Sequence, residues 1–194
     1  MSSGPREQIA DVYHLTSRGV DGRPIYIDDH HRFIFFRILA RAVAKRGVSL
    51  HANCLMSNHF HLVVETLADD ELAPFMQYLN STYARIFNEI EDRRGYLFEN
   101  PYKSVRVESE RHALEVCRYV VLNPIRAYIC DSPQDYRWSS YRATLGLVSR
   151  PPFLTTRWVL ENLHPNLDRA RVEYALFVEE GARETIAKRE LRAA

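Results

Sequence analysis

The sequence predicts an α+β fold: a split β-α-β-β-α-β arrangement, in which an antiparallel sheet carries helices on one face. Two observations support this class. Four short segments are rich in β-branched and aromatic residues or alternate between apolar and polar positions, as strands do. Two longer segments between them repeat apolar residues at three- and four-residue steps, as amphipathic helices do. In this arrangement the other face of the sheet is free for a site.

The first strand and the first helix are separated by a loop that contains two arginines. Residues 11–17 alternate well enough for a strand, and the loop after them is rich in Gly, Asp and Pro. Asp28 or Asp29 can cap a helix that runs to about Arg46, with Gly47 at its end. The residues of this helix expected to face the core are Phe33, Phe36, Leu39, Ala40 and Val43.

A hairpin and the clearest helix of the chain follow. Residues 48–57 and 59–66 are predicted to be strands, joined by a tight turn at Ser57 and Asn58. The acidic run 69–71 then begins the helix. Its apolar stripe, which we assign to the core, comprises Leu72, Phe75, Met76, Leu79, Tyr83, Ile86, Phe87 and Ile90.

The fourth strand and a further helix complete the motif. Residues 102–108 alternate as a strand, with Lys103 and Val105 on one face. The next helix spans about Ser109 to Asn123, with Ser109 as its cap. This helix has an apolar side that can pack on the domain and a polar side that carries several candidate functional residues.

The remaining chain is expected to form a helical tail. Helices are predicted near residues 155–163 and 168–181, and the last dozen residues are charged and expected to fray. We therefore divide the chain into a main domain, residues 1–148, and a helical C-terminal tail, residues 149–194.

The charge is balanced overall but unevenly distributed. The chain has 26 basic and 25 acidic residues, so its formal net charge of +1 does not itself indicate nucleic acid. Residues 51–92 contain 1 basic and 7 acidic groups, whereas residues 1–50 and 93–149 each carry a net charge of +3. This pattern fits a protein with one face toward phosphate, although ordinary solvated faces would give it equally well.

Cysteine usage and the N-terminal residues indicate the compartment. Cys54, Cys117 and Cys130 are odd in number and lack Cys-x-x-Cys spacing, which favours reduced thiols over a disulfide framework or a zinc knuckle. The N-terminal residues lack the apolar core of a signal peptide, and the most apolar run is interrupted by Arg37 and Arg41. We expect a cytoplasmic protein.

His59 and His61 lie two residues apart on a predicted strand. Alternate side chains of a strand share a face, so the two imidazoles project together. Two imidazoles in this arrangement can hold one metal ion. Two polar residues on the wet face of a half-buried strand would have the same spacing, so the metal hypothesis needs a third ligand and a reacting group.

The helix over residues 109–123 offers both. Tyr119 and Asn123 are four residues apart, so the phenol and the carboxamide point the same way. Each has an ordinary explanation as well, because Asn before Pro often ends a helix and a tyrosine can simply lie on the surface. Together with His59 and His61, however, the amide oxygen makes a three-ligand site with open positions. The phenol is a nucleophile that can form a phosphodiester with DNA.

The mixed nitrogen and oxygen ligands favour Mg²⁺ or Mn²⁺ with retained waters. Structural zinc would need four closed ligands. Hydrolytic zinc sites with a strand His-x-His usually need a third histidine or an aspartate close by, and two valines follow here instead.

These residues resemble the two signatures of the REP-associated tyrosine transposases, single-tyrosine members of the HUH superfamily. One signature is segment 55–61, Leu-Met-Ser-Asn-His-Phe-His, and the other is segment 118–127, Arg-Tyr-Val-Val-Leu-Asn-Pro-Ile-Arg-Ala. Val20-Asp21 departs from the pair of asparagines expected in this family. The resemblance covers nearly the whole chain and also includes Tyr13-His14-Leu15, Arg18-Gly19, Tyr102-Lys103-Ser104, Trp138-Ser139-Ser140-Tyr141 and the tail pattern 174–181.

The resemblance implies a metal-dependent endonuclease and strand transferase that cleaves and rejoins single-stranded DNA, often at hairpins formed by palindromic repeats. His59 and His61 would be metal ligands, and Asn123 would assist the metal. Tyr119 would be the nucleophile, keeping the 5′ phosphate and releasing a 3′ hydroxyl. The protein would act as a monomer or a homodimer, and Tyr119 could serve the histidines of its own chain or of a partner.

Basic side chains along the sheet and the following helix are the candidates for DNA contacts, and any of them could instead be a solvated surface charge. Two other functions remain open: a non-catalytic module of the same fold that binds single-stranded nucleic acid, and a zinc hydrolase. The candidates for DNA contacts are Arg18, Arg23, Lys103, Arg106, Arg118 and Arg126.

Overall fold

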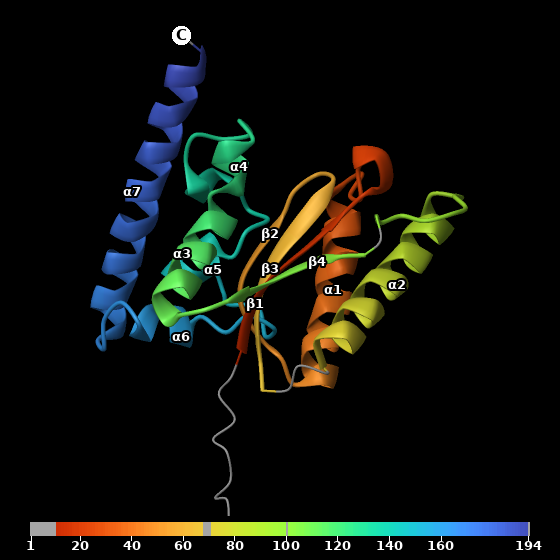
Figure 1. The fold of residues 1–194 in the computed structure, drawn as a ribbon, viewed down its shortest axis with the longest axis horizontal. Coiled ribbons are helices and arrows are strands. Elements are labelled where there is room, and N and C mark those ends of the chain that lie inside the picture. Colours follow the sequence, from red (N-terminus) through yellow and green to blue (C-terminus); the bar gives the residue numbers. More distant parts are fainter. Residues whose placement is uncertain (1–10, 68–70, 100, 194) are drawn as a thin grey trace, which may run out of the picture.

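The computed structural model describes residues 11–67, 71–99 and 101–193. Its first part contains, in chain order, β1 (Asp11–Arg18), α1 (Asp29–Arg46), β2 (Ser49–Leu55), β3 (His59–Thr66), α2 (Leu72–Ile90) and β4 (Lys103–Val107). The strands pair antiparallel in the order β2-β3-β1-β4, so the predicted α+β class and its β-α-β-β-α-β order are confirmed (Figure 1). The predicted helix start at residues 69–70 lies outside the described residues.

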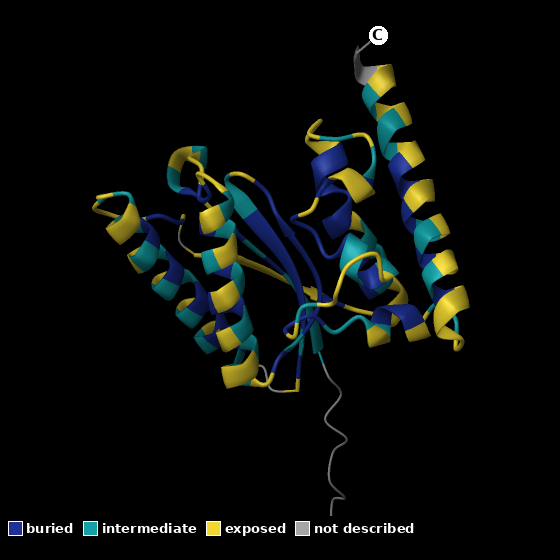
Figure 2. Ribbon diagram, turned by 180° about the vertical axis from the view of Figure 1, so that it is seen from behind, coloured by how far each residue is buried: buried dark blue, intermediate teal, exposed yellow. Residues whose placement is uncertain are grey.

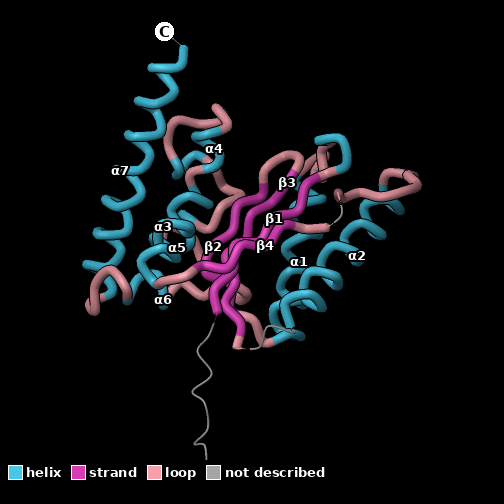
Figure 3. Tube along the Cα trace, viewed as in Figure 1, coloured by secondary structure: helices cyan, strands magenta, loops and turns pink. Residues whose placement is uncertain are grey.

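The later elements are helical. They are α3 (Glu110–Val121), α4 (Asn123–Arg126), α5 (Tyr141–Leu145), α6 (Arg157–Glu161) and α7 (Leu167–Ala193), and short 3-10 turns occur at Val20–Gly22 and Pro133–Asp135. The sheet lies between α1 and α2 on one side and the later helices on the other (Figure 3). Because α3 contacts β2, β3 and β4, the face predicted to be free is partly covered by the helix that carries the candidate tyrosine.

The pairing of β1 with β3 decides which side chains meet on the sheet. Thr16 lies opposite His61 and Arg18 lies opposite His59, so these four side chains share one face. β4 joins the other edge of β1 with Lys103 opposite Thr16, which adds a basic residue to the same face. The three strands therefore bring a histidine pair and two basic residues to one end of the sheet.

The turn between β2 and β3 is the predicted two-residue turn, although β2 itself ends two residues earlier than expected. The Met56 amide donates to the His59 carbonyl at 2.9 Å, which closes the hairpin around Ser57 and Asn58. The loop after β1 is bonded to this turn, because the Gly19 amide donates to the Asn58 carbonyl at 2.8 Å. The start of the histidine strand is thus fixed from both sides.

The main core lies between the sheet and the first two helices. Phe60 is fully buried on the face opposite the histidines, and its ring centroid lies 4.8 Å from that of Phe35 in α1. The predicted α2 stripe is buried except for Ile86, which is partly buried, and Ile90, which is 45% exposed. Figure 2 shows the buried faces of α1 and α2 turned toward the sheet and the exposed faces turned away from it.

The predicted inward face of α1 is confirmed at Leu39 and wrong at Phe33, and the other three predicted residues are partly buried against the core. Phe33 is 57% exposed, whereas Phe35 and Ile38 are buried. His31 also faces inward: it is buried, and its backbone and ring nitrogens both bond to the Asp28 cap, at 3.0 and 2.8 Å. A polar residue thus takes an inward position that an apolar periodicity does not indicate.

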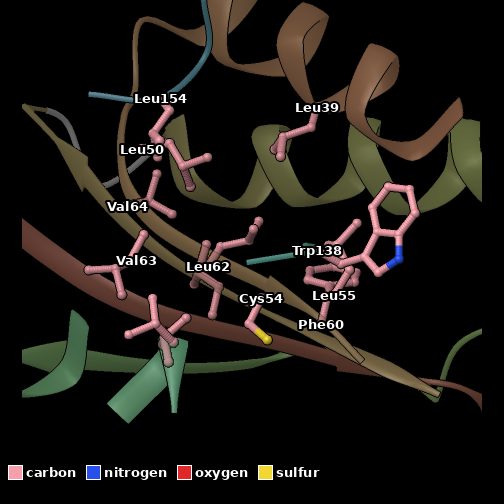
Figure 4. Close-up of a cluster of buried hydrophobic side chains, with 14 of the residues drawn as sticks. Leu39, Leu50, Cys54, Leu55, Phe60, Leu62, Val63, Val64, Trp138 and Leu154 are labelled. Carbon is pink, nitrogen blue, oxygen red and sulfur yellow. The ribbon is translucent and has the colours of Figure 1, made fainter. Parts of the chain in front are cut away.

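Two segments from the second half of the chain cover the outer edge of β2. Ser139 forms an antiparallel bridge with Cys54, and Leu154 forms a parallel bridge with Leu50. Figure 4 shows Leu154 beside Leu50, and Trp138 near Leu55 at the other end of the strand. Covering an edge strand in this way removes a surface on which another chain could pair.

The C-terminal tail is more regular than the sequence predicts. The expected fraying of the last dozen residues is wrong, because α7 continues to Ala193 and packs along α3, α4, α5 and α6. Gly181 permits the close approach, since a Cβ there would lie 2.8 Å from a methyl carbon of Leu122. The division into residues 1–148 and 149–194 stays a prediction.

The cysteines are free thiols, as predicted. All three cysteines are free, with Cys54 and Cys117 buried and Cys130 partly buried. Among residues 11–67, 71–99 and 101–193, no helix combines the length and apolar character that crossing a membrane requires.

A substitution at Trp138 tests how much the covered edge of β2 contributes to stability. Its ring is 8% exposed and packs against Phe33 and Phe36, with ring centroids 5.3 and 6.1 Å apart. Trp138→Ala should lower the free energy of unfolding by about 3–5 kcal/mol, measured by urea denaturation. Tyr96→Ala, at a residue that is 80% exposed, should change it by less than about 0.5 kcal/mol. Equal effects of the two substitutions would contradict this packing.

Candidate active site

A pocket of about 380 Å³ lies where the ends of β1, β3 and β4 meet the C-terminal end of α3. It contains all four predicted catalytic residues, His59, His61, Tyr119 and Asn123, which come from segments 60 residues apart in the sequence. The other lining residues are Thr16, Arg18, Asn58, Glu99, Pro101 and Lys103.

His61 is held in place by two residues of the neighbouring strand. Its Nδ1 lies 2.9 Å from Nε2 of His14 and 3.2 Å from the Thr16 hydroxyl. The His14 and His61 rings are stacked, with centroids 5.1 Å apart. These contacts occupy Nδ1, which leaves Nε2 as the nitrogen of His61 available for another partner.

His59 is oriented by its neighbour in the turn. Its Nδ1 lies 2.7 Å from Oδ1 of Asn58, and because an amide oxygen can only accept, Nδ1 is the protonated nitrogen and Nε2 the free acceptor. The ring centroids of His59 and His61 are 4.9 Å apart at 85°. The two imidazoles therefore meet in one pocket, each with Nε2 available.

Burial keeps the histidines neutral. Desolvation, followed by the neighbouring His14 and His59, lowers the pKa of His61 to about 3. Desolvation also lowers the pKa of His59, with a smaller contribution from the positive charge of Arg18, and lowers that of His14. A neutral imidazole is the form that binds a metal, so the ligand form of His61 exists at neutral pH without metal.

Tyr119 faces the histidines from α3. Its ring packs edge-on against His61 and His14, with centroids 6.0 and 5.9 Å away. Tyr119 is 38% exposed, so it is not buried in the core, and it lines the same pocket as His59 and His61. The guanidinium of Arg126 lies over the Tyr119 ring, 4.7 Å from its centroid.

Asn123 begins α4 rather than ending α3, which stops two residues earlier than predicted. Its side-chain nitrogen donates to the carbonyl oxygens of Tyr119 and Val120, at 3.0 and 3.3 Å. Both amide hydrogens are thereby used, and the carbonyl oxygen remains for another partner. The residue is 8% exposed, so this oxygen belongs to a buried, fixed side chain at the pocket wall.

Three of the six predicted DNA-contact residues lie at or beside the pocket, and the other three lie away from it. Arg18 and Lys103 line the pocket, and Arg126 lies against Tyr119. Arg23 is an exposed residue of the loop after β1, with Asp21 at 3.8 Å, and does not line the pocket.

Arg106 and Arg118 have intramolecular partners. Arg106 pairs with Asp11 at the other end of the sheet. Arg118 is enclosed between α3 and α7, where it bonds Glu115 at 2.6 Å and stacks on Phe177 at 4.3 Å. Both arginines lie outside the pocket.

Five pocket or supporting residues were not among the predicted site residues: His14, Thr16, Asn58, Glu99 and Pro101. Strand alternation places His14 and Thr16 on the same face as Arg18, so the first two could have been found once β1 was paired with β3. Glu99 lies in a connection without regular structure, and nothing in the local sequence signals its position.

The two histidines of the pocket can hold a divalent cation only if an amide oxygen or a water supplies further ligands. Within the described residues, no group of three or more His, Cys, Asp or Glu side chains is placed to hold a metal ion. The two imidazoles with free Nε2 atoms and the Asn123 oxygen provide three neutral ligands, compatible with a cation that retains waters. Glu99 is the carboxylate of the same pocket.

A family model described as "Transposase IS200 like" matches residues 12–123 of this chain. The match covers more than half of the chain and includes every strand of the sheet. The chain therefore belongs to the IS200-like transposase family, and its role is that of a transposase. No curated protein matches the sequence.

Among solved structures, a REP-associated tyrosine transposase bound to a REP hairpin shares the fold. The TM-score is 0.60 at 13% identity, covering 80% of this chain and 92% of that one. A second structure, from Deinococcus radiodurans R1 and provisionally described as a transposase, has 20% identity and a TM-score of 0.45, covering 62% of this chain and 95% of that one.

The lowered pKa of His61 has a measurable effect on stability. Its pKa is about 3 in the folded protein and about 6.5 when unfolded, so the unfolded state binds the proton first and stability falls as pH drops below 6.5. Between pH 7 and pH 5, without metal, His61 should account for a loss of about 2 kcal/mol. His61→Asn should lose correspondingly less over this range, by urea denaturation in EDTA. An identical loss in both proteins would contradict the buried, neutral state of His61.

Proposed function

We propose that the protein cleaves and rejoins single-stranded DNA through a covalent bond between Tyr119 and a 5′ phosphate. The observation that carries this proposal is the convergence of His59, His61, Tyr119 and Asn123 in one pocket of a transposase-family fold. The basic residues Arg18 and Lys103 on the same pocket support a phosphate-containing substrate.

The chemistry is a displacement at phosphorus. The phenolic oxygen of Tyr119 attacks the phosphorus and forms a phosphotyrosine bond, while the bond from phosphorus to the 3′ oxygen of the preceding nucleotide breaks. The phenolic proton passes to water, and the departing oxygen takes up a proton to become a 3′ hydroxyl. Attack by a 3′ hydroxyl on the phosphotyrosine reverses the step, so resealing requires no ATP.

A divalent cation, Mg²⁺ or Mn²⁺, belongs to this proposal. His59 and His61 would hold it through their Nε2 atoms, and Asn123 through its amide oxygen. When bound, such an ion polarises the phosphate that is attacked. His14 and Asn58 would fix the two rings in the orientation that binding needs.

The natural target is proposed to be a hairpin formed by a palindromic repeat. The solved transposase of the same fold is bound to a REP hairpin, which supports this class of DNA for the present chain. A non-catalytic module that only binds single-stranded DNA is the second candidate, because the fold alone does not require cleavage.

Tyr119→Phe separates the two candidates. Incubation of the wild-type protein with labelled single-stranded repeat hairpins and Mn²⁺ should give a protein–DNA species that survives denaturation. Tyr119→Phe removes one oxygen atom and should abolish this species, a loss of at least about 10³-fold, while hairpin binding changes less than twofold. Tyr96→Phe, at an exposed tyrosine outside the pocket, is the matched control and should retain full activity. Adduct formation by Tyr119→Phe would show that another residue is the nucleophile.

A further inference from the structure

We propose that the cleft between α3, α4 and α7 is a second DNA subsite, which holds the single strand on one side of the phosphate attacked by Tyr119. The cleft encloses about 290 Å³. The proposal rests on the proposed function for the identity of the strand, but it assigns contacts to α4, α7 and the segment after α4. The residues that carry the argument are Tyr119, Arg126, Tyr128, Glu184, Lys188 and Arg189.

The cleft meets the histidine pocket at Tyr119, which lines both. A phosphodiester has a nucleotide on each side, and a strand whose phosphate reaches Tyr119 must therefore leave in two directions. The histidine pocket offers a path for one direction, and the cleft toward α7 offers a path for the other.

The cleft carries more positive than negative charge. Four basic and two acidic residues line the cleft, and one pair of these, Arg118 and Glu115, bond to each other at 2.6 Å. The remaining lining charges are Arg126, Lys188 and Arg189 against Glu184. Arg189 is paired with Asp131 at 3.2 Å and donates to the Ile125 carbonyl at 3.3 Å, so Arg126 and Lys188 against Glu184 leave a surplus of one positive charge. A surplus of positive charge in a cleft attracts a phosphate backbone.

Two tyrosine rings of the cleft are each paired with an arginine. Arg126 lies over Tyr119 at 4.7 Å and Arg189 lies over Tyr128 at 4.0 Å. Tyr128 is 61% exposed and has a φ of 61°, a conformation that is strained for a tyrosine. Grooves that bind single strands combine basic residues with exposed rings on which bases stack, and this cleft has both.

Single-site variants on α7 and in the segment after α4 test the subsite without touching the catalytic residues. The probe is a fluorescein-labelled 15-nucleotide oligothymidine, and its Kd is measured by anisotropy between 50 and 300 mM NaCl without divalent metal. Lys188→Gln removes a positive charge from the cleft, and Glu184→Gln removes a negative charge one turn away on the same helix. Arg41→Gln is the matched control, because Arg41 is exposed on α1, across the sheet from the cleft.

The two cleft variants should move affinity in opposite directions. Lys188→Gln should weaken binding roughly threefold at 50 mM NaCl and reduce the slope of log Kd against log salt by about 0.7, the value for one phosphate contact on a single strand. Glu184→Gln should tighten binding by a similar factor, and Arg41→Gln should leave it unchanged.

The Tyr128→Asn variant tests the contribution of base stacking separately from that of charge. Asparagine tolerates the left-handed backbone and has no ring, so the variant should bind roughly fivefold more weakly with an unchanged salt slope. If Lys188→Gln and Glu184→Gln behave like Arg41→Gln, or if the wild-type protein does not bind the oligothymidine at 50 mM NaCl, the subsite is refuted. These readouts need no cleavage, so a failure of the Tyr119 adduct assay would be a separate result.

Discussion

The antiparallel pairing of β1 with β3 is the constraint on which the site depends. It sets Thr16 against His61 and Arg18 against His59, and it brings His14 within 2.9 Å of the His61 ring. A shift of one residue would turn both imidazoles into the core and expose Phe60 to water. The fully buried Phe60 and Leu62 oppose that shift, so burial of one face of β3 fixes the chemistry of the other.

The helix that carries Tyr119, α3, is positioned by the sheet and by α7 together. α3 packs on the sheet through Cys117, Val120 and Val121, and α7 covers its outer side through the close approach at Gly181. Asn123 bonds back to the Tyr119 carbonyl, which links the candidate metal ligand to the backbone of the tyrosine. The tail thus stabilises the helix that presents Tyr119 to the histidines, and it also forms one wall of the cleft beside the tyrosine.

Sequence periodicity predicted much of this arrangement, because its signals are local. Alternation along β3 and the four-residue spacing of Tyr119 and Asn123 placed each pair on one face, and the α2 stripe identified the core. On α1, Phe33 was wrongly assigned to the core, and buried His31, paired with Asp28, was missed because a polar residue does not follow apolar periodicity. The supporting role of His14 depends on pairing between distant strands. The enclosure of Arg118 depends on the path of α7, and neither feature leaves a signal in a short window of sequence.

The central claim is that paired imidazoles and the Asn123 amide hold a divalent cation beside Tyr119. The most direct measurement is anomalous diffraction from crystals of the Tyr119→Phe protein grown with Mn²⁺, in which the ligands are intact and no turnover occurs. The account predicts one Mn²⁺ peak within bonding distance of Nε2 of both His59 and His61. Fully occupied Mn²⁺ elsewhere, or these nitrogens unliganded at saturating Mn²⁺, would contradict it.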